Sequence, residues 1–151
     1  MPVTPDPAGP ETILAFDYGL RRIGVAVGQS VTGSASPLGI VANGPDGVDE
    51  AQLSALVAEW RPTRLVVGLP MHADGSPSEM QQHVAAFVDL LARYALPVDT
   101  IDERYTSVEA EAALKNARIE GRRGRITKAA IDSAAAVLIA ERYLAARVAS
   151  V

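Results

Sequence analysis

Residues 13–28 read ILAFDYGLRRIGVAVG, two apolar runs separated by a short polar segment. The first four residues are apolar and lead to a carboxylate, Asp17, after which Tyr18 and Gly19 are typical of a turn. A second apolar run, residues 23–28, begins at hairpin distance, so the two runs predict a pair of antiparallel strands. The folded part of the chain is therefore expected to begin with a β-hairpin whose first strand ends in an aspartate.

Downstream of this hairpin, strands and helices are expected to alternate. The third, fourth and fifth strands are predicted at residues 38–42, 65–68 and 98–101. Helices are predicted over residues 49–60, 78–94, 107–117 and about 127–149. Strands joined by short turns pair antiparallel, whereas helical crossovers make strands parallel. The sequence thus predicts an α/β domain, a mixed five-stranded sheet with its first three strands antiparallel and its later ones parallel, flanked by helices.

The length and composition favour one soluble domain. A chain of 151 residues suits a single domain with a substantial core. Residues 1–11 hold four prolines without periodicity and are expected to be a disordered lead, so the domain is assigned to residues 12–151. The longest apolar run, 134–140, is far shorter than the ~20 residues of a membrane span. The start lacks the features of a secretory signal, so a cytoplasmic protein without membrane contact is expected.

Several kinds of site are excluded by composition. The chain contains no cysteine, which rules out disulfides, thiolate zinc sites and a cysteine nucleophile. It contains only two histidines, so a histidine-rich metal site is excluded as well. The net charge of −4 argues against a general nucleic-acid binder, but residues 115–128 carry six basic residues and one acid, a local charge of +5. This segment is either a solvated basic loop or a surface for phosphates.

A purely structural role explains the positions of three acids poorly. Asp17 ends an apolar strand, although an aspartate-initiated turn would also explain it. Glu103 follows the fifth predicted strand, and its structural alternative is a favourable interaction with a helix dipole. Asp132, with Ser133, interrupts an otherwise apolar run, and a buried carboxylate needs a cation or another partner. That partner is either a metal ion or Lys128, one helical turn away.

Together these acids indicate metal chemistry. Asp17 and Glu103 lie at the carboxyl ends of two predicted strands, where ligand sites gather in open α/β sheets, and the last helix could bring Asp132 beside them. Three carboxylates without histidine or cysteine suit Mg²⁺ or Mn²⁺. Two such ions, ~3.5–4 Å apart, would stabilise the attacking and the leaving oxygen of a phosphodiester.

Four motifs also resemble the YqgF/RuvX family. They are DYGLRRIGVA at 17–26, GLPM with the following Asp74, Gly75 and Gln81, DERYTS at 102–107, and Lys128 with IDSAA at 131–135. The resemblance covers residues 12 to about 145. It implies an RNase H-like fold related to RuvC-type Holliday junction resolvases, and a nuclease that matures the 5′ end of the 16S ribosomal RNA precursor, with junction resolution as the competing activity. It also implies that Asp17, Glu103 and Asp132 are the metal-binding catalytic acids.

The resemblance has one visible departure. Family members often carry Ser-Asp after the second strand, where this chain has Gln29-Ser30. The three-carboxylate set is intact, but an auxiliary metal or substrate role at that position is in doubt.

Four further residues are candidates for substrate binding. Gly19 would permit close approach of a phosphate to the backbone, although turn geometry alone would also require it. Arg22 is predicted in the turn that follows Asp17 and could hold a phosphate, and Arg104 directly follows Glu103 and could contact the substrate or orient that acid. Lys128 could stabilise developing charge or pair with Asp132. Arg22 is equally well explained as a surface charge of the hairpin.

The function classes left open share this fold. A nuclease acting on precursor RNA and a resolvase acting on branched DNA would use identical chemistry, and the sequence does not separate them. A resolvase favours a twofold dimer, whereas RNA trimming does not, so the chain is expected to be a monomer or a homodimer. An actin-like ATPase would need a second such domain, and a non-catalytic nucleic-acid-binding factor would have to keep three acids together without a metal.

Overall fold

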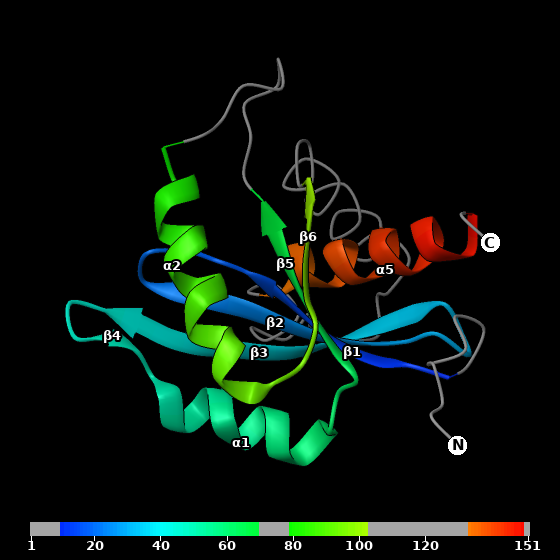
Figure 1. Cartoon of the computed structure of the whole chain (residues 1–151), viewed down its shortest axis with the longest axis horizontal. Helices are drawn as coiled ribbons and strands as arrows, with labels where there is room; N and C mark the ends of the chain where they lie inside the picture. Colours follow the sequence, from blue (N-terminus) through cyan, green and yellow to red (C-terminus); the bar gives the residue numbers. More distant parts are fainter. Residues whose placement is uncertain (1–9, 70–78, 103–132, 150–151) are drawn as a thin grey trace, which may run out of the picture.

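The structure is a computed structural model that describes residues 10–69, 79–102 and 133–149 (Figure 1). Its strands are β1 (Thr12–Asp17), β2 (Arg22–Gln29), β3 (Ser34–Gly44), β4 (Gly47–Val48), β5 (Arg64–Leu69) and β6 (Val98–Asp102). Its helices are α1 (Glu50–Trp60), α2 (Gln81–Leu91), the 3₁₀ turn η1 (Ala92–Tyr94) and α5 (Ala134–Ala149). The predicted helix at 107–117 and residues 127–132 of the predicted last helix lie outside the described residues; α5 itself begins at Ala134, after Ser133, rather than near residue 127.

The strands form one mixed sheet in the order β4-β3-β2-β1-β5-β6. β1 pairs antiparallel with β2, and β2 with β3, whereas β1, β5 and β6 run parallel. The carboxyl ends of β1, β3, β5 and β6 therefore meet at one edge of the sheet, called here the carboxyl edge. The predicted directions of the strands are confirmed.

Two details of the strands were not predicted. β4 pairs with Asn43 and Gly44, because Gly47 at φ 92° lets the chain close a hairpin where only a loop was expected. β3 starts at Ser34 rather than 38, and it contains Pro37. The register shifts opposite Val25 and Ala26, and such a bulge tolerates a proline because the ladder is interrupted there.

The helices begin and end for local reasons. Asp49 caps α1, its carboxylate accepting a hydrogen bond from the backbone N–H of Gln52 at 3.1 Å. The predicted helix over 78–94 is shorter in the structure, because its end tightens into η1 and Ala95 turns the chain with φ 56°. The predicted apolar stripe of α2 is confirmed, with Val84, Phe87 and Leu91 buried.

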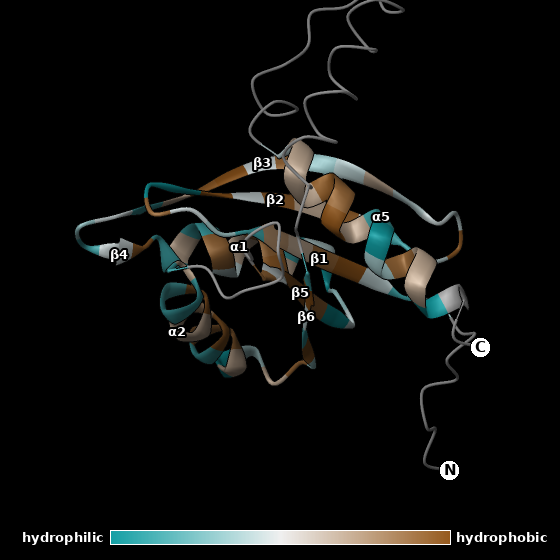
Figure 2. Ribbon diagram, turned by 90° about the horizontal axis from the view of Figure 1, so that it is seen from above, coloured by the Kyte–Doolittle hydropathy of each residue, from teal (hydrophilic) through white to brown (hydrophobic). Residues whose placement is uncertain are grey.

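Two hydrophobic layers cover the two faces of the sheet. Figure 2 shows α5 on one face and α1 with α2 on the other. On the α5 face, Ile13 and Ala15 of β1 pack with Ile139, Ala140 and other residues of the helix. On the opposite face, alternate residues of the same strands pack against α1 and α2. On β1, β2 and β5 the parity of a residue thus gives the face on which it lies, whereas the bulge changes this parity within β3.

The start of the folded domain lies slightly earlier than predicted. Glu11, assigned to the disordered lead, exchanges hydrogen bonds with Ser30: its backbone N–H donates to Ser30 Oγ at 2.7 Å, and its carbonyl accepts from the Ser30 N–H at 3.0 Å. The pairing extends the β1–β2 ladder by one residue, so Glu11 belongs to the domain. In the described part of the chain, no helix is long and apolar enough to cross a membrane.

Candidate active site at the carboxyl edge of the sheet

Asp17 ends β1 at the carboxyl edge and is half-buried. Alternation along β1 places it on the same face as Ile13 and Ala15, which is the face that α5 covers. It pairs across the sheet with Gly24 of β2. The sequence-predicted acid therefore lies on the α5 face at the edge where parallel strands end.

Glycines flank Asp17 on both neighbouring strands. Gly24 is its antiparallel partner, and the pairing of Phe16 with Val67 makes Gly68 the next residue on β5. Neither neighbouring strand therefore places a side chain beside the carboxylate on this face. This glycine arrangement was not predicted, because it depends on which strands become neighbours.

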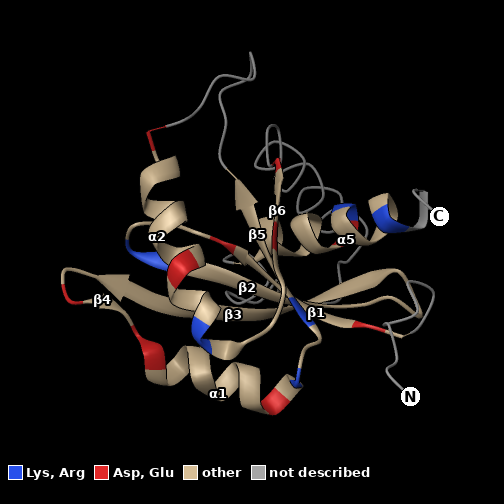
Figure 3. Cartoon of the chain, in the orientation of Figure 1, with Lys and Arg blue, Asp and Glu red and all other residues tan. Residues whose placement is uncertain are grey.

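β6 brings a second acid to the same edge. Asp102 ends β6, paired with Leu69, and Figure 3 shows acidic residues at the ends of both β1 and β6. The odd-numbered residues of β6 face α5, since Ile101 packs on the α5 layer and Asp99 accepts a hydrogen bond from Tyr143 of that helix. Asp102, an even-numbered residue, is on the other face from Asp17. Its sequence neighbour Glu103, the predicted catalytic acid, lies outside the described residues.

The start of α5 is fixed to the sheet by a buried serine. Ser133 is fully buried, and its Oγ accepts a hydrogen bond from the backbone N–H of Gly39 at 3.3 Å. Gly39 pairs with Val25, which in turn pairs with Phe16, the residue before Asp17. The first turn of α5 is thus held at the level of the end of β1. Sequence reasoning noted Ser133 only as a polar interruption, since its partner is 94 residues away.

The β1–β2 turn has a structural reason for its glycine. A Cβ at Gly19 would lie 2.6 Å from the carbonyl oxygen of Arg22, closer than any side chain tolerates. The side-chain amide of Asn43 donates to the Gly19 carbonyl at 2.8 Å, and the Asn43 N–H donates to the Arg21 carbonyl at 3.0 Å. The turn is therefore anchored to β3. Turn geometry alone accounts for Gly19, and its substrate role stays a prediction.

The other predicted site residues divide into two groups. Arg22 is exposed and belongs to the α5 face, since it shares the parity of Gly24. Glu103, Arg104, Lys128 and Asp132 lie outside the described residues. Within the described residues, no group of three or more histidine, cysteine, aspartate or glutamate side chains could hold a metal ion. The predicted three-acid set is represented there by Asp17 alone.

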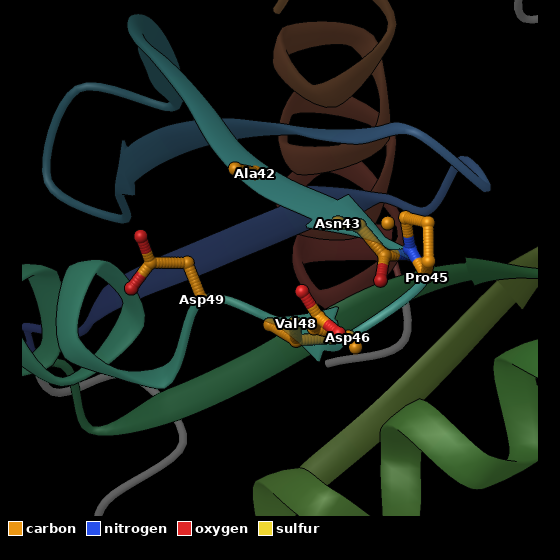
Figure 4. Close-up of a pocket in the computed structure, with 8 residues that line it drawn as sticks. Ala42, Asn43, Pro45, Asp46, Val48 and Asp49 are labelled. Atoms are coloured by element: carbon orange, nitrogen blue, oxygen red, sulfur yellow. The ribbon is translucent and has the colours of Figure 1, made fainter.

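A hollow of about 360 Å³ lies beside the site, in the β3–β4 hairpin. Its lining runs from Ala42 to Asp49 (Figure 4). The carboxylate of Asp49 is turned away from that of Asp46 and caps α1. Asn43 lines the hollow and also anchors the β1–β2 turn. Two polar residues of the hollow, Asn43 and Asp49, thus make structural contacts.

A polar cluster occupies the opposite edge of the sheet, where β1, β5 and β6 begin. Tyr143 donates a hydrogen bond to Asp99, which also pairs with Arg64 at 3.0 Å. Arg147 donates to the Tyr143 hydroxyl at 3.1 Å and pairs with Glu11 at 3.0 Å. This cluster was not predicted, although the spacing of Tyr143 and Arg147 by one helical turn was a visible signal.

The cluster changes the acidity of its tyrosine. Burial, followed by the hydrogen bond and the negative charge of Asp99, raises the pKa of Tyr143 from 10.0 to about 12, against the opposing effect of Arg64 and Arg147. The hydroxyl therefore stays protonated across the physiological range and remains a donor to Asp99. Positive and negative charges are both present, so the cluster ties α5 to the sheet rather than forming an anion or cation site.

The sequence of this chain matches the model of a known protein family. A family model described as "RuvX: Holliday junction resolvase" matches residues 11–146. The chain belongs to the RuvX family. The match includes every described strand of this RuvX-family chain and most of α5. The resemblance read from the four sequence motifs is thereby confirmed.

Individual relatives of this RuvX-family chain carry a consistent name. A protein of Paraburkholderia xenovorans is 50% identical over 134 residues, which are 88% of this chain and 87% of that protein. A protein of Burkholderia lata is 48% identical over 134 residues, 88% of each chain. Both are named "Putative pre-16S rRNA nuclease".

Solved structures with the same fold are those of RuvC. The RuvC of T. thermophilus in complex with a Holliday junction substrate has a TM-score of 0.57 at 17% identity, covering 93% of this chain and 97% of its own. A second Thermus thermophilus RuvC structure has a TM-score of 0.54 at 14% identity, covering 91% and 96%. At these identities the likeness concerns the fold, and it confirms the predicted RNase H-like architecture.

Proposed function

We propose that this chain is a divalent-metal-dependent nuclease that hydrolyses phosphodiester bonds in the maturation of the 5′ end of the 16S ribosomal RNA precursor. The observation that carries the proposal is the position of Asp17. It stands at the carboxyl edge on the α5 face, with Gly24 and Gly68 on either side, in a chain of the RuvX family. Relatives about half identical to the chain are named for this activity.

The chemistry of the available donors fits a hard metal ion. Asp17 supplies carboxylate oxygens, and the flanking Gly24 and Gly68 add no side chain of their own beside it. Asp17, Glu103 and Asp132 would together hold two Mg²⁺ or Mn²⁺ ions. When bound, such ions activate water for attack and neutralise the charge that develops on the leaving oxygen.

Other residues of the chain anchor α5 to the sheet and supply positive charge for the substrate. The hydrogen bond from Gly39 to Ser133 holds the start of α5 against β3, and Asp132 is the residue before Ser133 in the sequence. Ile101 and Asp99 face α5 along β6, and Glu103 follows the last residue of that strand in the sequence. Arg22, Arg104 and Lys128 would bind the phosphates of the substrate. In this proposal, Asp17, Glu103 and Asp132 act together on the α5 face.

Cleavage assays test this proposal directly. Purified protein with Mg²⁺ or Mn²⁺ is incubated with precursor 16S RNA and, in parallel, with a mobile four-way DNA junction. The Asp17→Asn and Asp132→Asn variants are expected to lose cleavage, by at least about a hundredfold, because each removes a charged ligand. Asp89→Asn, on the exposed side of α2, is the matched control and is expected to cut like the wild type.

The substrate arm separates the two candidate activities. Cutting of the RNA alone supports the processing nuclease, which the names of the relatives favour. Paired symmetric nicks in the junction support a resolvase instead, the activity in the description of the family. A resolvase needs two sites related by a twofold axis, so sedimentation of the active species as a dimer would accompany that outcome. Binding of RNA without metal-dependent cutting of either substrate would refute the nuclease proposal in favour of a non-catalytic factor.

A further inference from the structure

An apolar residue is exposed in line with Asp17. Asp17 pairs with Gly24, and Gly24 pairs with Ile40 of β3, so the three residues form one row across the sheet. Cross-strand partners face the same side, and Val41 is buried on the opposite face, so Ile40 belongs to the α5 face. Nevertheless Ile40 is 37% exposed. Gly24 between them adds no side chain, so the carboxylate and the isoleucine border an open stretch of backbone.

The exposure of Ile40 follows from where α5 begins. Ser133, just before the helix, accepts its hydrogen bond from Gly39, one residue before Ile40. The described part of α5 then covers the sheet in the other direction, over Ala35 and towards Ile13. Ile40 therefore lies beyond the helix, on the side of the carboxyl edge.

Arg22 extends this uncovered surface. It has the same parity on β2 as Gly24, pairs with Ala42 of β3, and is exposed, as is Ala42. The four residues Arg22, Gly24, Ile40 and Ala42 are called here the open strip. The open strip presents one cationic side chain, Arg22, and two aliphatic ones, Ile40 and Ala42. Gly24 adds no side chain between them and Asp17.

We infer that the open strip is a binding surface for one strand of nucleic acid, with a phosphate at Arg22 and the apolar face of a ribose or an unstacked base against Ile40. The inference rests on the proposed nuclease function. A nucleic-acid strand is the ligand that alternates an anion with apolar surface at each repeat, which matches a cation beside an aliphatic side chain. The nearby acids Asp46 and Asp49 belong to the hollow of the β3–β4 hairpin, where Asp49 caps α1 on the other side of the sheet.

The anchored β1–β2 turn supports the same assignment. Leu20, at its tip, is 54% exposed, and Arg21 beside it is exposed as well. Asn43 holds the carbonyls on either side of Leu20, those of Gly19 and Arg21. An apolar tip followed by two arginines therefore stands in a fixed position at the end of the strip. Fixed contacts bind with less loss of conformational entropy than flexible ones.

The test measures binding of a fluorescein-labelled precursor 16S RNA fragment, and of the labelled four-way junction, by anisotropy in Mg²⁺ at several salt concentrations. All variants carry Asp17→Asn so that the probes stay uncut. Ile40→Thr keeps a β-branched residue in the strand and is expected to weaken binding roughly three- to tenfold, with no change in the salt dependence. Arg22→Ala is expected to reduce the slope of log affinity against log salt by about 1.

A matched control is available on the same hairpin. Val31 is also an exposed β-branched residue, 76% accessible, but it lies in the β2–β3 turn at the opposite edge of the sheet. Val31→Thr is expected to leave the affinity and its salt dependence unchanged. Circular dichroism of both threonine variants would verify that each is folded.

The outcomes distinguish failure of this inference from failure of the proposed function. If the protein cuts nucleic acid but Ile40→Thr binds as tightly as Val31→Thr, the strip is not the binding surface and the nuclease proposal stands. If Ile40→Thr changes self-association in sedimentation while affinity is unchanged, the strip is a contact between copies, and the inference is overturned. If the wild type neither binds nor cuts either probe, the proposed function fails and the inference falls with it.

Discussion

Replacing Tyr143 by phenylalanine tests how the polar cluster holds α5 on the sheet. The ring of Tyr143 is 7% exposed, and its hydroxyl donates to the Asp99 carboxylate and accepts from Arg147. A hydrogen bond to a charged group contributes about 1.5–3 kcal/mol, so Tyr143→Phe is expected to lower the free energy of unfolding by about that amount at pH 7.5. Urea unfolding followed by circular dichroism measures it.

The same hydroxyl predicts how stability depends on pH. The pKa of Tyr143 is raised from 10.0 to about 12 in the folded protein, by burial first and by Asp99 second. A raised pKa means that the folded state holds the proton more tightly. The resulting stability is present below pH 10 and is lost as the pH rises through about 12. The shift corresponds to about 3 kcal/mol in total, most of which is lost by pH 11.5.

The control for this prediction is Tyr94, whose hydroxyl lies 2.8 Å from Ser54 Oγ at the surface. Tyr94→Phe breaks a neutral and exposed contact, so it is expected to cost under about 1 kcal/mol. Between pH 9 and 11.5 the wild type and Tyr94→Phe should lose stability more steeply than Tyr143→Phe. Parallel pH curves for the wild type and Tyr143→Phe would refute the assigned role of the Asp99 contact.

Three other predictions concern packing, capping and metal. Gly28→Ala is expected to lower the free energy of unfolding by about 1–3 kcal/mol, because its Cβ would lie 3.2 Å from Leu144 Cδ1 of α5. Gly44→Ala, whose Cβ would have no neighbouring atom within 4 Å, should change it by under about 0.5 kcal/mol, and thermal unfolding of the two variants measures the difference. Asp49→Ala removes the cap on the Gln52 N–H and is expected to cost about 1 kcal/mol in urea unfolding, while Asp49→Asn, which can still cap, should be near neutral. Treatment with a chelator is expected to abolish cleavage without unfolding the chain, and added Mg²⁺ should restore it; a chelated protein that still cuts would contradict the metal-dependent mechanism.

Much of the candidate site could be predicted from local patterns. Asp17 was identified because a carboxylate at the end of an apolar strand lacks solvation, and the structure places it at the carboxyl edge on the α5 face. Glu103 is predicted because it follows the carboxyl end of another strand, and Asp132 because it interrupts an apolar run; both stay predictions. Gly19 was assigned two roles, and the distance of 2.6 Å to the Arg22 carbonyl supports the turn geometry.

Other features of the site could not be predicted because they depend on strand order. Nothing in the local sequence indicates that Gly24 and Gly68 flank Asp17, since the two glycines lie 44 residues apart in the numbering. The exposure of Ile40 likewise depends on where α5 starts, and that is set by the hydrogen bond between Gly39 and Ser133. A single residue's hydropathy does not say which distant helix covers it.

The amino-acid sequence was enough to predict most of the strands and helices, the directions of the strands and the chemistry of the candidate acids. Apolar periodicity, turn residues and short connections act over a few residues, so the hairpin of β1 and β2, the stripe of α2 and the parallel direction of the later strands could be derived from them. Only the tertiary structure decided the row of Ile40, Gly24 and Asp17, the anchoring of Ser133 and the cluster around Tyr143. These contacts join residues far apart in the chain, and their geometry is set by packing across the sheet.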